Sequence, residues 1–363
     1  MDDDIYSNVD VSGLMDDDNV PIVTAKCQMI EFVNRCYADP VAPIVTGWQD
    51  LNTLLGGGLF TGLYTIGGRT GAGKTTMMIQ LCRDIIKNNS DTVAVYFGLE
   101  TKRDEISGKN ITGYLFETCG IQETFNGLRC GITEEHRDNI INRIVSSDEF
   151  ERFVFYSKES ALNSVNQIDN AITRINTKFP GKRFVVFVDY LQIMEDKDNT
   201  RDRRESVDKA IQNLSLMSST YDIPIIVATS LNRNSYDGND VKRLHNSSMK
   251  ESGGIEYTSD VTMFLEPQIK LHDKRKLVRE DDTANWNTGA GVVDDIYTQY
   301  LRLTIDKNRN GIRGVVPLKY AANYACFQRD DSACLKYNKA MDDYITTTRK
   351  NIGDNYTRLE DEV

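Results

Sequence analysis

Residues 68–75 read Gly-Arg-Thr-Gly-Ala-Gly-Lys-Thr, which matches the phosphate-binding loop pattern G-x-x-x-x-G-K-[S/T]. The glycines let successive backbone N–H groups point inward, and such groups cradle phosphates. The lysine would reach the β- and γ-phosphates, and the threonine hydroxyl after it would hold Mg²⁺. The pattern therefore predicts a site for a nucleoside triphosphate such as ATP with Mg²⁺. The residues expected to contact the nucleotide are Gly68, Arg69, Thr70, Gly71, Ala72, Gly73, Lys74, Thr75 and Thr76.

The alternative interpretation of this segment is a glycine-rich turn that carries a lysine by chance. The flanks favour the phosphate loop, because an apolar run at 63–66 precedes it and a helical run at 76–87 follows it. A helix that starts there also adds its positive N-terminus to the anion site.

Two carboxylates follow other apolar runs and complete the expected chemistry. Asp189 ends the run 184–188, where it would face the metal through a water; the alternative is an aspartate that starts a surface turn. Glu100 ends the run 93–99, where it would orient the attacking water; the alternative is a helix-capping glutamate. We expect the strand before Glu100 to neighbour the phosphate-loop strand, which would bring this carboxylate to the γ-phosphate.

The elements that must position these residues alternate between strand and helix. Compact apolar runs predict buried parallel strands at 63–67, 93–98, 152–156, 184–188 and 224–229. Helical periodicity predicts helices at 75–88, 103–117, 134–147, 164–178 and 203–220. The alternation predicts an α/β fold with a mostly parallel, doubly wound sheet. Further strands at 261–265, 300–305 and 313–319, with a long polar stretch at 268–296, predict an antiparallel C-terminal extension with a mobile loop.

Composition limits the class of protein. The 363 residues are 40% hydrophobic with a net charge of −11, and seven aspartates lie in the first twenty residues. This balance excludes a surface coated in basic charge for duplex DNA but allows a narrow basic channel. No apolar run is long enough to span a membrane. The seven cysteines form no C-x-x-C pair, so we expect free thiols in a reducing cytoplasm.

The chain divides into four predicted regions. Residues 1–20 are expected to be a disordered acidic tail, and 21–45 a linker-like helix, at about 22–37, with its connection. Residues 46–330 form the predicted ATPase domain, and 331–363 a loosely attached tail.

Six sequence blocks, in this order, resemble the C-terminal motor domain of DnaB-type replicative helicases over roughly residues 46–330. The blocks are Thr46-Gly47-Trp48-Gln49-Asp50-Leu51-Asn52, Leu99-Glu100, Asp189-Tyr190-Leu191-Gln192-Ile193-Met194, Leu231-Asn232-Arg233, Lys250-Glu251-Ser252-Gly253-Gly254-Ile255-Glu256 and Lys307-Asn308-Arg309-Asn310-Gly311. Single blocks are only suggestive, but their common order is specific.

The resemblance implies a RecA-like domain in a ring, usually of six subunits, with ATP at each subunit boundary. Lys307 and Arg309 would then act in trans on the neighbour's nucleotide; without the resemblance, they would be a solvated strand edge. Lys250, Glu251 and Gly253 would grip single-stranded DNA; the alternative is a flexible polar loop. The implied function is 5′–3′ translocation and DNA unwinding in replication.

The chain departs from the family in two ways. Ser230 lies where the family carries the glutamine that senses the γ-phosphate. Because a serine hydroxyl is shorter and has fewer donors, we expect Ser230 to contact the γ-phosphate through a water molecule, or the coupling between hydrolysis and DNA movement to be altered. The family's N-terminal helical collar, which contacts primase, has no counterpart in these residues. We therefore expect assembly to depend on nucleotide, DNA, a loader or another partner, and a phage or mobile-element replication protein would fit this pattern.

Two other classes of function stay open at this point. One is a RecA-like recombination ATPase that forms filaments. The other is a non-motor protein that binds ATP as an assembly switch within a replisome. Filaments in electron micrographs would favour the first, and phosphate release that single-stranded DNA does not stimulate would favour the second.

Overall fold

The fold comes from a computed structural model that describes residues 14–15, 21–22, 24–38, 41–162, 164–191, 203–231, 252–267, 269–272, 276–279 and 298–330. The chain divides into two units, Met1–Pro43 and Ile44–Val363, and each is described by itself.

The first unit contains one helix, α1 (Ala25–Ala38), among its described residues, in the region where a helix was predicted. No residue of α1 is buried, and its apolar side chains Met29, Phe32, Val33 and Tyr37 are exposed. The short strands β1 (Leu14–Met15) and β2 (Pro21–Ile22) pair in antiparallel fashion. The rest of the predicted acidic tail lies outside the described residues.

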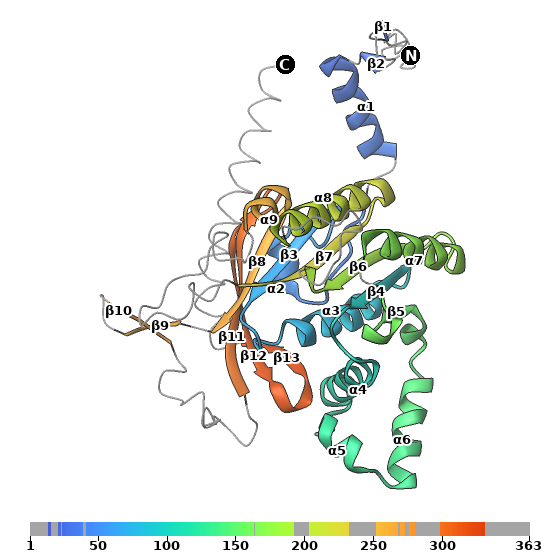
Figure 1. The fold of residues 1–363 in the computed structure, drawn as a ribbon, viewed down its shortest axis with the longest axis vertical. Coiled ribbons are helices and arrows are strands. Elements are labelled where there is room, and N and C mark those ends of the chain that lie inside the picture. The colour runs from blue at the N-terminus through green and yellow to red at the C-terminus, as the bar shows by residue number, and fades with distance from the viewer. Residues whose placement is uncertain are drawn as a thin grey trace, which may run out of the picture. The chain divides into compact units, whose positions relative to one another are not determined.

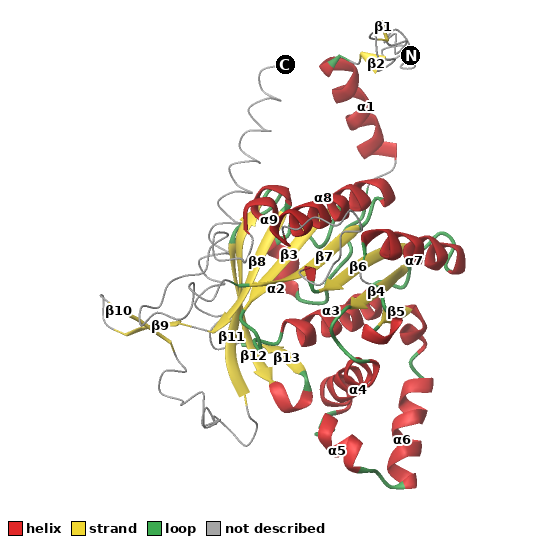
Figure 2. Ribbon diagram, viewed as in Figure 1, coloured by secondary structure: helices red, strands yellow, loops and turns green. Residues whose placement is uncertain are grey.

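The second unit is built on a sheet of nine strands within the described residues (Figures 1 and 2). Their order is β13-β12-β11-β8-β3-β7-β6-β4-β5, in which β8 through β5 are parallel and β11, β12 and β13 are antiparallel additions. The fold-class prediction is therefore confirmed. The bounds are β3 Gly62–Gly68, β4 Thr92–Gly98, β5 Phe153–Tyr156, β6 Arg183–Asp189, β7 Pro224–Ser230, β8 Val261–Pro267, β11 Thr298–Asn308, β12 Gly314–Ala321 and β13 Cys326–Arg329.

Helices cover both faces of this sheet (Figure 1). Their bounds are α2 Gln49–Leu54, α3 Lys74–Asn88, α4 Arg103–Cys119, α5 Phe125–Cys130, α6 Glu134–Val145, α7 Val165–Lys178, α8 Arg203–Tyr221 and α9 Ser252–Thr258. Short 3₁₀ turns are η1 Asp148–Arg152, η2 Lys158–Ser160 and η7 Ala322–Tyr324. Alternate strand residues enter two cores, one shared with α2, α3 and α4, the other with α7, α8 and α9. Burial on both faces explains why the parallel strands are continuous apolar runs.

One expectation about the sheet is wrong. The strand before Glu100, β4, does not neighbour the phosphate-loop strand β3, because β7 and β6 lie between them. An apolar run identifies a buried strand but not its partners, which are decided by the crossover connections. Here β4 pairs with β6 in full register, from Thr92–Arg183 to Gly98–Asp189.

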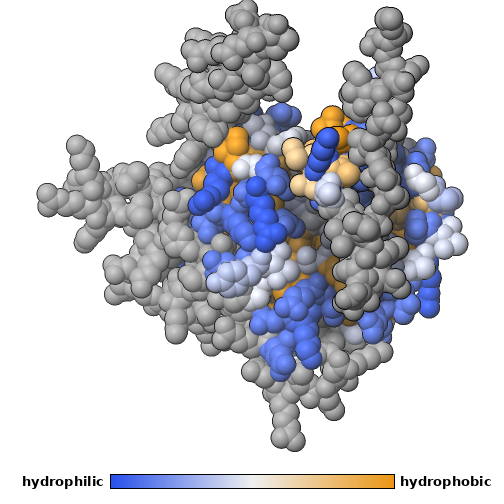
Figure 3. Space-filling model, turned by 90° about the horizontal axis from the view of Figure 1, so that it is seen from above, coloured by the Kyte–Doolittle hydropathy of each residue, from blue (hydrophilic) through white to orange (hydrophobic). Residues whose placement is uncertain are grey.

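The polar stretch 268–296 lies mostly outside the described residues, and so does the predicted tail 331–363. Within the first, β9 (Ile269–His272) and β10 (Lys276–Arg279) form an antiparallel pair. On the face seen in Figure 3, the described residues are mostly hydrophilic, with small separate apolar patches. Among the described helices, none combines the length and apolarity needed to cross a bilayer.

Candidate nucleotide-binding site

The predicted phosphate loop connects β3 to α3. Gly71 and Gly73 have φ values of 80° and 94°, a backbone conformation that favours glycine. Gly73 precedes the first residue of α3, and a Cβ atom there would lie 2.9 Å from the Phe327 ring. The loop thus has both the turn geometry and the helix N-terminus that an anion site needs.

Lys74 lies folded over this loop. Its Nζ donates to the carbonyl oxygens of Gly68, at 2.7 Å, and of Arg69, at 3.0 Å. Burial lowers the pKa of Lys74, and the charges of Asp189 and Glu100 act in the opposite direction. The ammonium therefore shares its surroundings with both predicted catalytic carboxylates, although their strands lie away from β3.

The predicted metal ligands are in contact. The Thr75 hydroxyl donates to Asp189 Oδ2 at 2.6 Å, and Asp189 is only 5% exposed at the end of β6. Hydroxyl and carboxylate oxygens are hard ligands that suit Mg²⁺, which usually takes few protein ligands and completes its shell with phosphates and water. The described residues contain no cluster of three or more His, Cys, Asp or Glu side chains able to hold a metal.

Glu100 and Ser230 lie at the same edge of the sheet. The Leu99 N–H donates to the Asp189 carbonyl at 2.7 Å, which places the exposed Glu100 next to this predicted metal ligand. Ser230, half-buried at the end of β7, pairs with Gly68, the first residue of the phosphate loop. The carboxyl ends of parallel strands thus gather the predicted groups at one edge, as open α/β sheets generally do.

Aromatic residues that no motif predicted support the loop from the antiparallel extension. Tyr320 of β12 and Phe327 of β13 stack with ring centroids 4.2 Å apart, and both rings approach Gly73. The Gln80 side chain bonds the Phe327 backbone at both its N–H and carbonyl, at 2.7 and 2.9 Å. The C-terminal strands therefore fix the position of α3. The sequence predicted a strand in the region of β12 but gave no indication of its contact with Gly73.

Lys307 and Arg309 lie at the opposite edge of the sheet. The Lys307 Nζ donates to the carbonyls of Glu256 and Ser259, both at 2.7 Å, at the C-terminal end of α9. Arg309 donates to Asp260 Oδ1 at 2.9 Å and to the Tyr257 carbonyl at 2.8 Å, and its side chain is 51% exposed. Burial and the nearby Arg309 lower the pKa of Lys307.

A β-bulge explains the direction of Lys307. Ile305 pairs with Met263 but Lys307 pairs with Thr262, so Asp306 is an extra residue in β11. In an unbroken register Lys307 would pair with Val261 and face the core of α2 and α3. The bulge turns it to the other face, on which α9 lies.

The structure describes only some of the predicted DNA-binding residues. Lys250 and Glu251, like Asn232 and Arg233, lie outside the described residues. Gly253 falls in α9, which packs on α8 so closely that a Cβ atom at Gly254 would overlap the Asp208 carboxylate. The grip on DNA therefore stays a prediction.

A buried polar cluster lies along α3 behind the phosphate loop. The Trp48 indole donates to Asp84 Oδ2 at 2.7 Å, and Arg83 approaches Glu117 at 3.5 Å. Burial and then the Glu117 carboxylate raise the pKa of Asp84 to about 7, against the effects of Arg83 and the Trp48 hydrogen bond. This cluster links the block that begins at Thr46 to α3 and α4.

The raised pKa of Asp84 predicts a pH-dependent stability. Because the carboxyl ionises near pH 4 when unfolded, its favourable contribution is full below pH 4 and is lost as pH rises through about 7. We expect the wild type to lose about 1–3 kcal/mol of unfolding free energy between pH 5 and pH 8 through this group. Asp84→Asn, whose amide still accepts from Trp48, should flatten that slope in urea titrations at the two pH values.

Asp91→Asn is the matched control for this prediction. The exposed Asp91 pairs with Arg183, and its hydrogen bond to that side chain lowers the pKa of Asp91. Its contribution therefore changes below pH 4, and the slope from pH 5 to pH 8 should equal that of the wild type. An Asp84→Asn protein with an unaltered slope would contradict the assignment.

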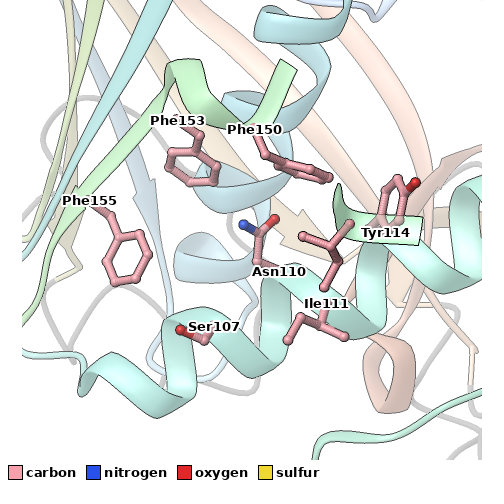
Figure 4. Close-up of a pocket in the computed structure, with 8 residues that line it drawn as sticks. Ser107, Asn110, Ile111, Tyr114, Phe150, Phe153 and Phe155 are labelled. Carbon is pink, nitrogen blue, oxygen red and sulfur yellow. The ribbon is translucent and has the colours of Figure 1, made fainter. Parts of the chain in front are cut away.

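A separate apolar cavity of about 250 Å³ lies beside α4, away from the phosphate loop (Figure 4). Aromatic rings from η1 and β5 face side chains of α4 across it, and α6 contributes Ile144. Its lining residues are Ser107, Asn110, Ile111, Tyr114, Ile144, Phe150, Phe153 and Phe155. Nearby on α6, Ile141 and Val145 are exposed, so this region offers apolar surface to a partner.

The sequence profile of the DnaB-like helicase C terminal domain matches residues 43–329. The chain belongs to this family. Relatives named "Replicative DNA helicase DnaB" include that of Rickettsia felis, 26% identical over 300 residues, which cover 80% of this chain and 58% of the relative. The Helicobacter pylori protein is 23% identical over 312 residues, which cover 79% of this chain and 59% of the relative. The chain thus spans somewhat more than half the length of these family members.

Solved structures of the family share the fold. The "ATPase Domain of G40P" matches with a TM-score of 0.63 at 22% identity, over 84% of this chain and 97% of that one. A structure described as a DnaB-like replicative helicase and its interactions with primase matches with a TM-score of 0.63 at 21% identity, over 85% and 67% of the two chains. These similarities show the fold alone, a mostly parallel α/β sheet with antiparallel C-terminal strands.

Proposed function

We propose that this chain is the ATP-hydrolysing motor of a DnaB-type DNA helicase, which moves 5′ to 3′ on single-stranded DNA during replication, in the cytoplasm. One observation carries the proposal. Arg309 lies at the amino-terminal edge of the sheet, where its N–H bonds Asp260 and Asp260 in turn bonds Leu63, whereas the phosphate loop begins at Gly68 at the other end of β3. Five residues of extended strand separate the two by about 16 Å. A half-exposed arginine so placed suits the nucleotide of a neighbouring copy.

Within one site, the roles follow from the side chains. Lys74 would exchange its loop carbonyls for the β- and γ-phosphates, while Thr75 and Asp189 would hold Mg²⁺, which supplies charge to neutralise the phosphates. Glu100, exposed and next to Asp189, accepts the proton of the attacking water and orients it. Ser230, beside Gly68, senses the γ-phosphate through water.

The neighbouring copy completes the site. Lys307 and Arg309 add two cations where charge develops on the γ-phosphate, and in nucleotide hydrolases such an arginine accelerates the reaction about 10³–10⁵-fold. Arg309 still has N–H donors beyond the two that bond Asp260 and Tyr257. It is thus held in one orientation without using up its capacity to bind phosphate.

Such sharing requires a head-to-tail assembly, which we propose closes into a ring of six copies. α1 is suited to join them, because its face of Met29, Phe32 and Val33 is exposed in the isolated chain. We propose that the apolar face of α1 from a neighbouring copy binds in the apolar cavity beside α4. Light scattering with Mg²⁺-ATP and oligo-dT should give six times the monomer mass, and a persistent monomer would count against the ring. The same proposal includes loader or primase-type replication proteins as partners of the ring.

Unwinding of a forked DNA substrate tests the function most simply. The wild type should separate the strands in an ATP-dependent reaction, whereas Lys74→Ala and Glu100→Gln should not. If the wild type hydrolyses ATP but leaves the fork intact at all protein concentrations, the motor proposal fails.

The grip on DNA has its own test. Lys250 and the glycines after it suit contacts to phosphates rather than bases, and six copies around a channel concentrate this weak charge. Lys250→Ala should lower the affinity for oligo-dT and reduce the slope of log Kd against log salt by about 0.7 for each subunit that contacts a phosphate. Lys182→Ala, which removes a lysine bonded to the Ser90 carbonyl, should leave that slope unchanged. Equal slopes for wild type and Lys250→Ala would exclude the contact.

A non-motor ATP switch is the second candidate, and Ser230 favours it. The shorter hydroxyl beside Gly68 reaches less far toward a γ-phosphate than the glutamine of the family. Phosphate release that rises on single-stranded DNA supports the motor, whereas release indifferent to DNA supports the switch.

A further inference from the structure

Tyr96 is a buried polar side chain that the roles described above do not use. It lies in β4, whose seven residues are all buried, and it is 0% exposed. A buried tyrosine normally places its hydroxyl on a specific partner. Here that partner is the metal carboxylate, because the Tyr96 hydroxyl donates to Asp189 Oδ2 at 2.7 Å.

The two carboxylate oxygens of Asp189 differ in their hydrogen-bond partners. Oδ2 accepts both the Tyr96 hydroxyl and the Thr75 hydroxyl, at 2.7 and 2.6 Å. Oδ1 is the oxygen that neither hydroxyl occupies. Two donors on one oxygen prevent rotation of the carboxylate, whose side chain is otherwise short and free to turn about its last torsion.

Only one of these donors is independent of the nucleotide site. Thr75 belongs to the phosphate loop, and its oxygen is the predicted metal ligand. Tyr96 comes from β4, which lies three positions from β3 with β7 and β6 between them, and its backbone is held in the sheet.

We propose that Tyr96 is a positioning residue for Mg²⁺: its hydroxyl holds Oδ2 of Asp189 so that Oδ1 stays directed at the metal and its water. This inference rests on the proposed ATP site. In this proposal Tyr96 acts on the metal indirectly, through Asp189, and its phenol also interacts with the Thr101 side chain. Its loss should therefore weaken the binding of Mg²⁺, and leave nucleotide binding without metal unaffected.

Tyr96→Phe removes the hydroxyl and keeps the buried ring, and binding of a fluorescent ATP analogue over a Mg²⁺ titration gives the readout. Losing a hydrogen bond to a charged group should raise the Mg²⁺ concentration for half-maximal binding about 5–20-fold. Binding in EDTA should stay unchanged. ATP turnover should recover to near the wild-type kcat at saturating Mg²⁺.

Tyr64→Phe is the matched control, because Tyr64 is also buried and, among the described residues, its hydroxyl bonds only the Phe60 backbone just before β3. Its Mg²⁺ requirement should equal that of the wild type. A Tyr96→Phe protein that matches this control overturns the inference and leaves the proposed function standing. Impaired folding, or lost binding in EDTA, would assign the phenol to structure and also overturn it. If the wild type binds no nucleotide at any Mg²⁺ concentration, the proposed function falls and the inference falls with it.

Discussion

Replacing Arg309 with alanine should lower kcat for DNA-stimulated ATP hydrolysis by about 10³–10⁵-fold, while the Kd for ATP changes little. The guanidinium lies away from its own phosphate loop and contributes little to holding the ground-state nucleotide in the same copy. Its charge is needed when negative charge develops on the γ-phosphate of the neighbour. Steady-state turnover, measured beside equilibrium binding of an ATP analogue, separates these two effects.

Arg183→Ala is the matched control for this variant. Arg183 begins β6 at the amino-terminal edge, and it pairs with Asp91 at 2.8 Å as Arg309 pairs with Asp260 at 2.9 Å. Removing an exposed ion pair costs about 0–1 kcal/mol of stability and should leave kcat within about twofold. Equal losses in both variants would indicate general damage at this edge and not a role for Arg309 in the reaction.

Replacing Glu100 with glutamine should lower kcat about 10²–10⁴-fold, the range for loss of a general base, and should change the Kd for ATP only modestly. The amide keeps the size of the side chain but cannot accept the proton of the attacking water. Because Glu100 also acts electrostatically on Lys74, a modest change in nucleotide affinity is expected with it. Single-turnover hydrolysis with excess protein measures the chemical step directly.

Glu105→Gln serves as the control for this second variant. Glu105 is a partly exposed carboxylate on α4 that pairs with Lys109 at 2.6 Å, and it has no part in the proposed reaction. Its turnover should stay close to that of the wild type. A Glu100→Gln protein with near wild-type turnover would mean that another group orients the water.

The sequence was most informative where a residue's role depends on its immediate neighbours. The phosphate loop is such a case, because its glycines, Lys74 and the start of α3 lie within eight residues. Asp189 is another, since it ends an apolar run, and parallel strands bring their carboxyl ends to one edge. Both arrangements appear in the structure as the spacing predicts.

Contacts between segments that lie far apart in the sequence were harder to predict. The order of strands placed β6 and β7 between β3 and β4, which an apolar pattern does not specify. Tyr320 and Phe327 contact Gly73 although they lie some 250 positions later in the chain. In the sequence, Tyr96 looks like any other residue of an apolar strand. The bulge at Asp306, which turns Lys307 toward α9, is visible only once β11 is paired with β8. Short elements such as α2, α5 and β13 carry too few periods to be recognised.

The central claim is that two neighbouring copies enclose each nucleotide, and a mixing experiment tests it most directly. Glu100→Gln copies keep Arg309, and Arg309→Ala copies keep Glu100, so each protein alone should be nearly inactive. In an equal mixture, roughly a quarter of head-to-tail interfaces combine an intact Glu100 with an intact Arg309, and turnover should recover toward that fraction of the wild type. A mixture no more active than its two components would contradict shared sites.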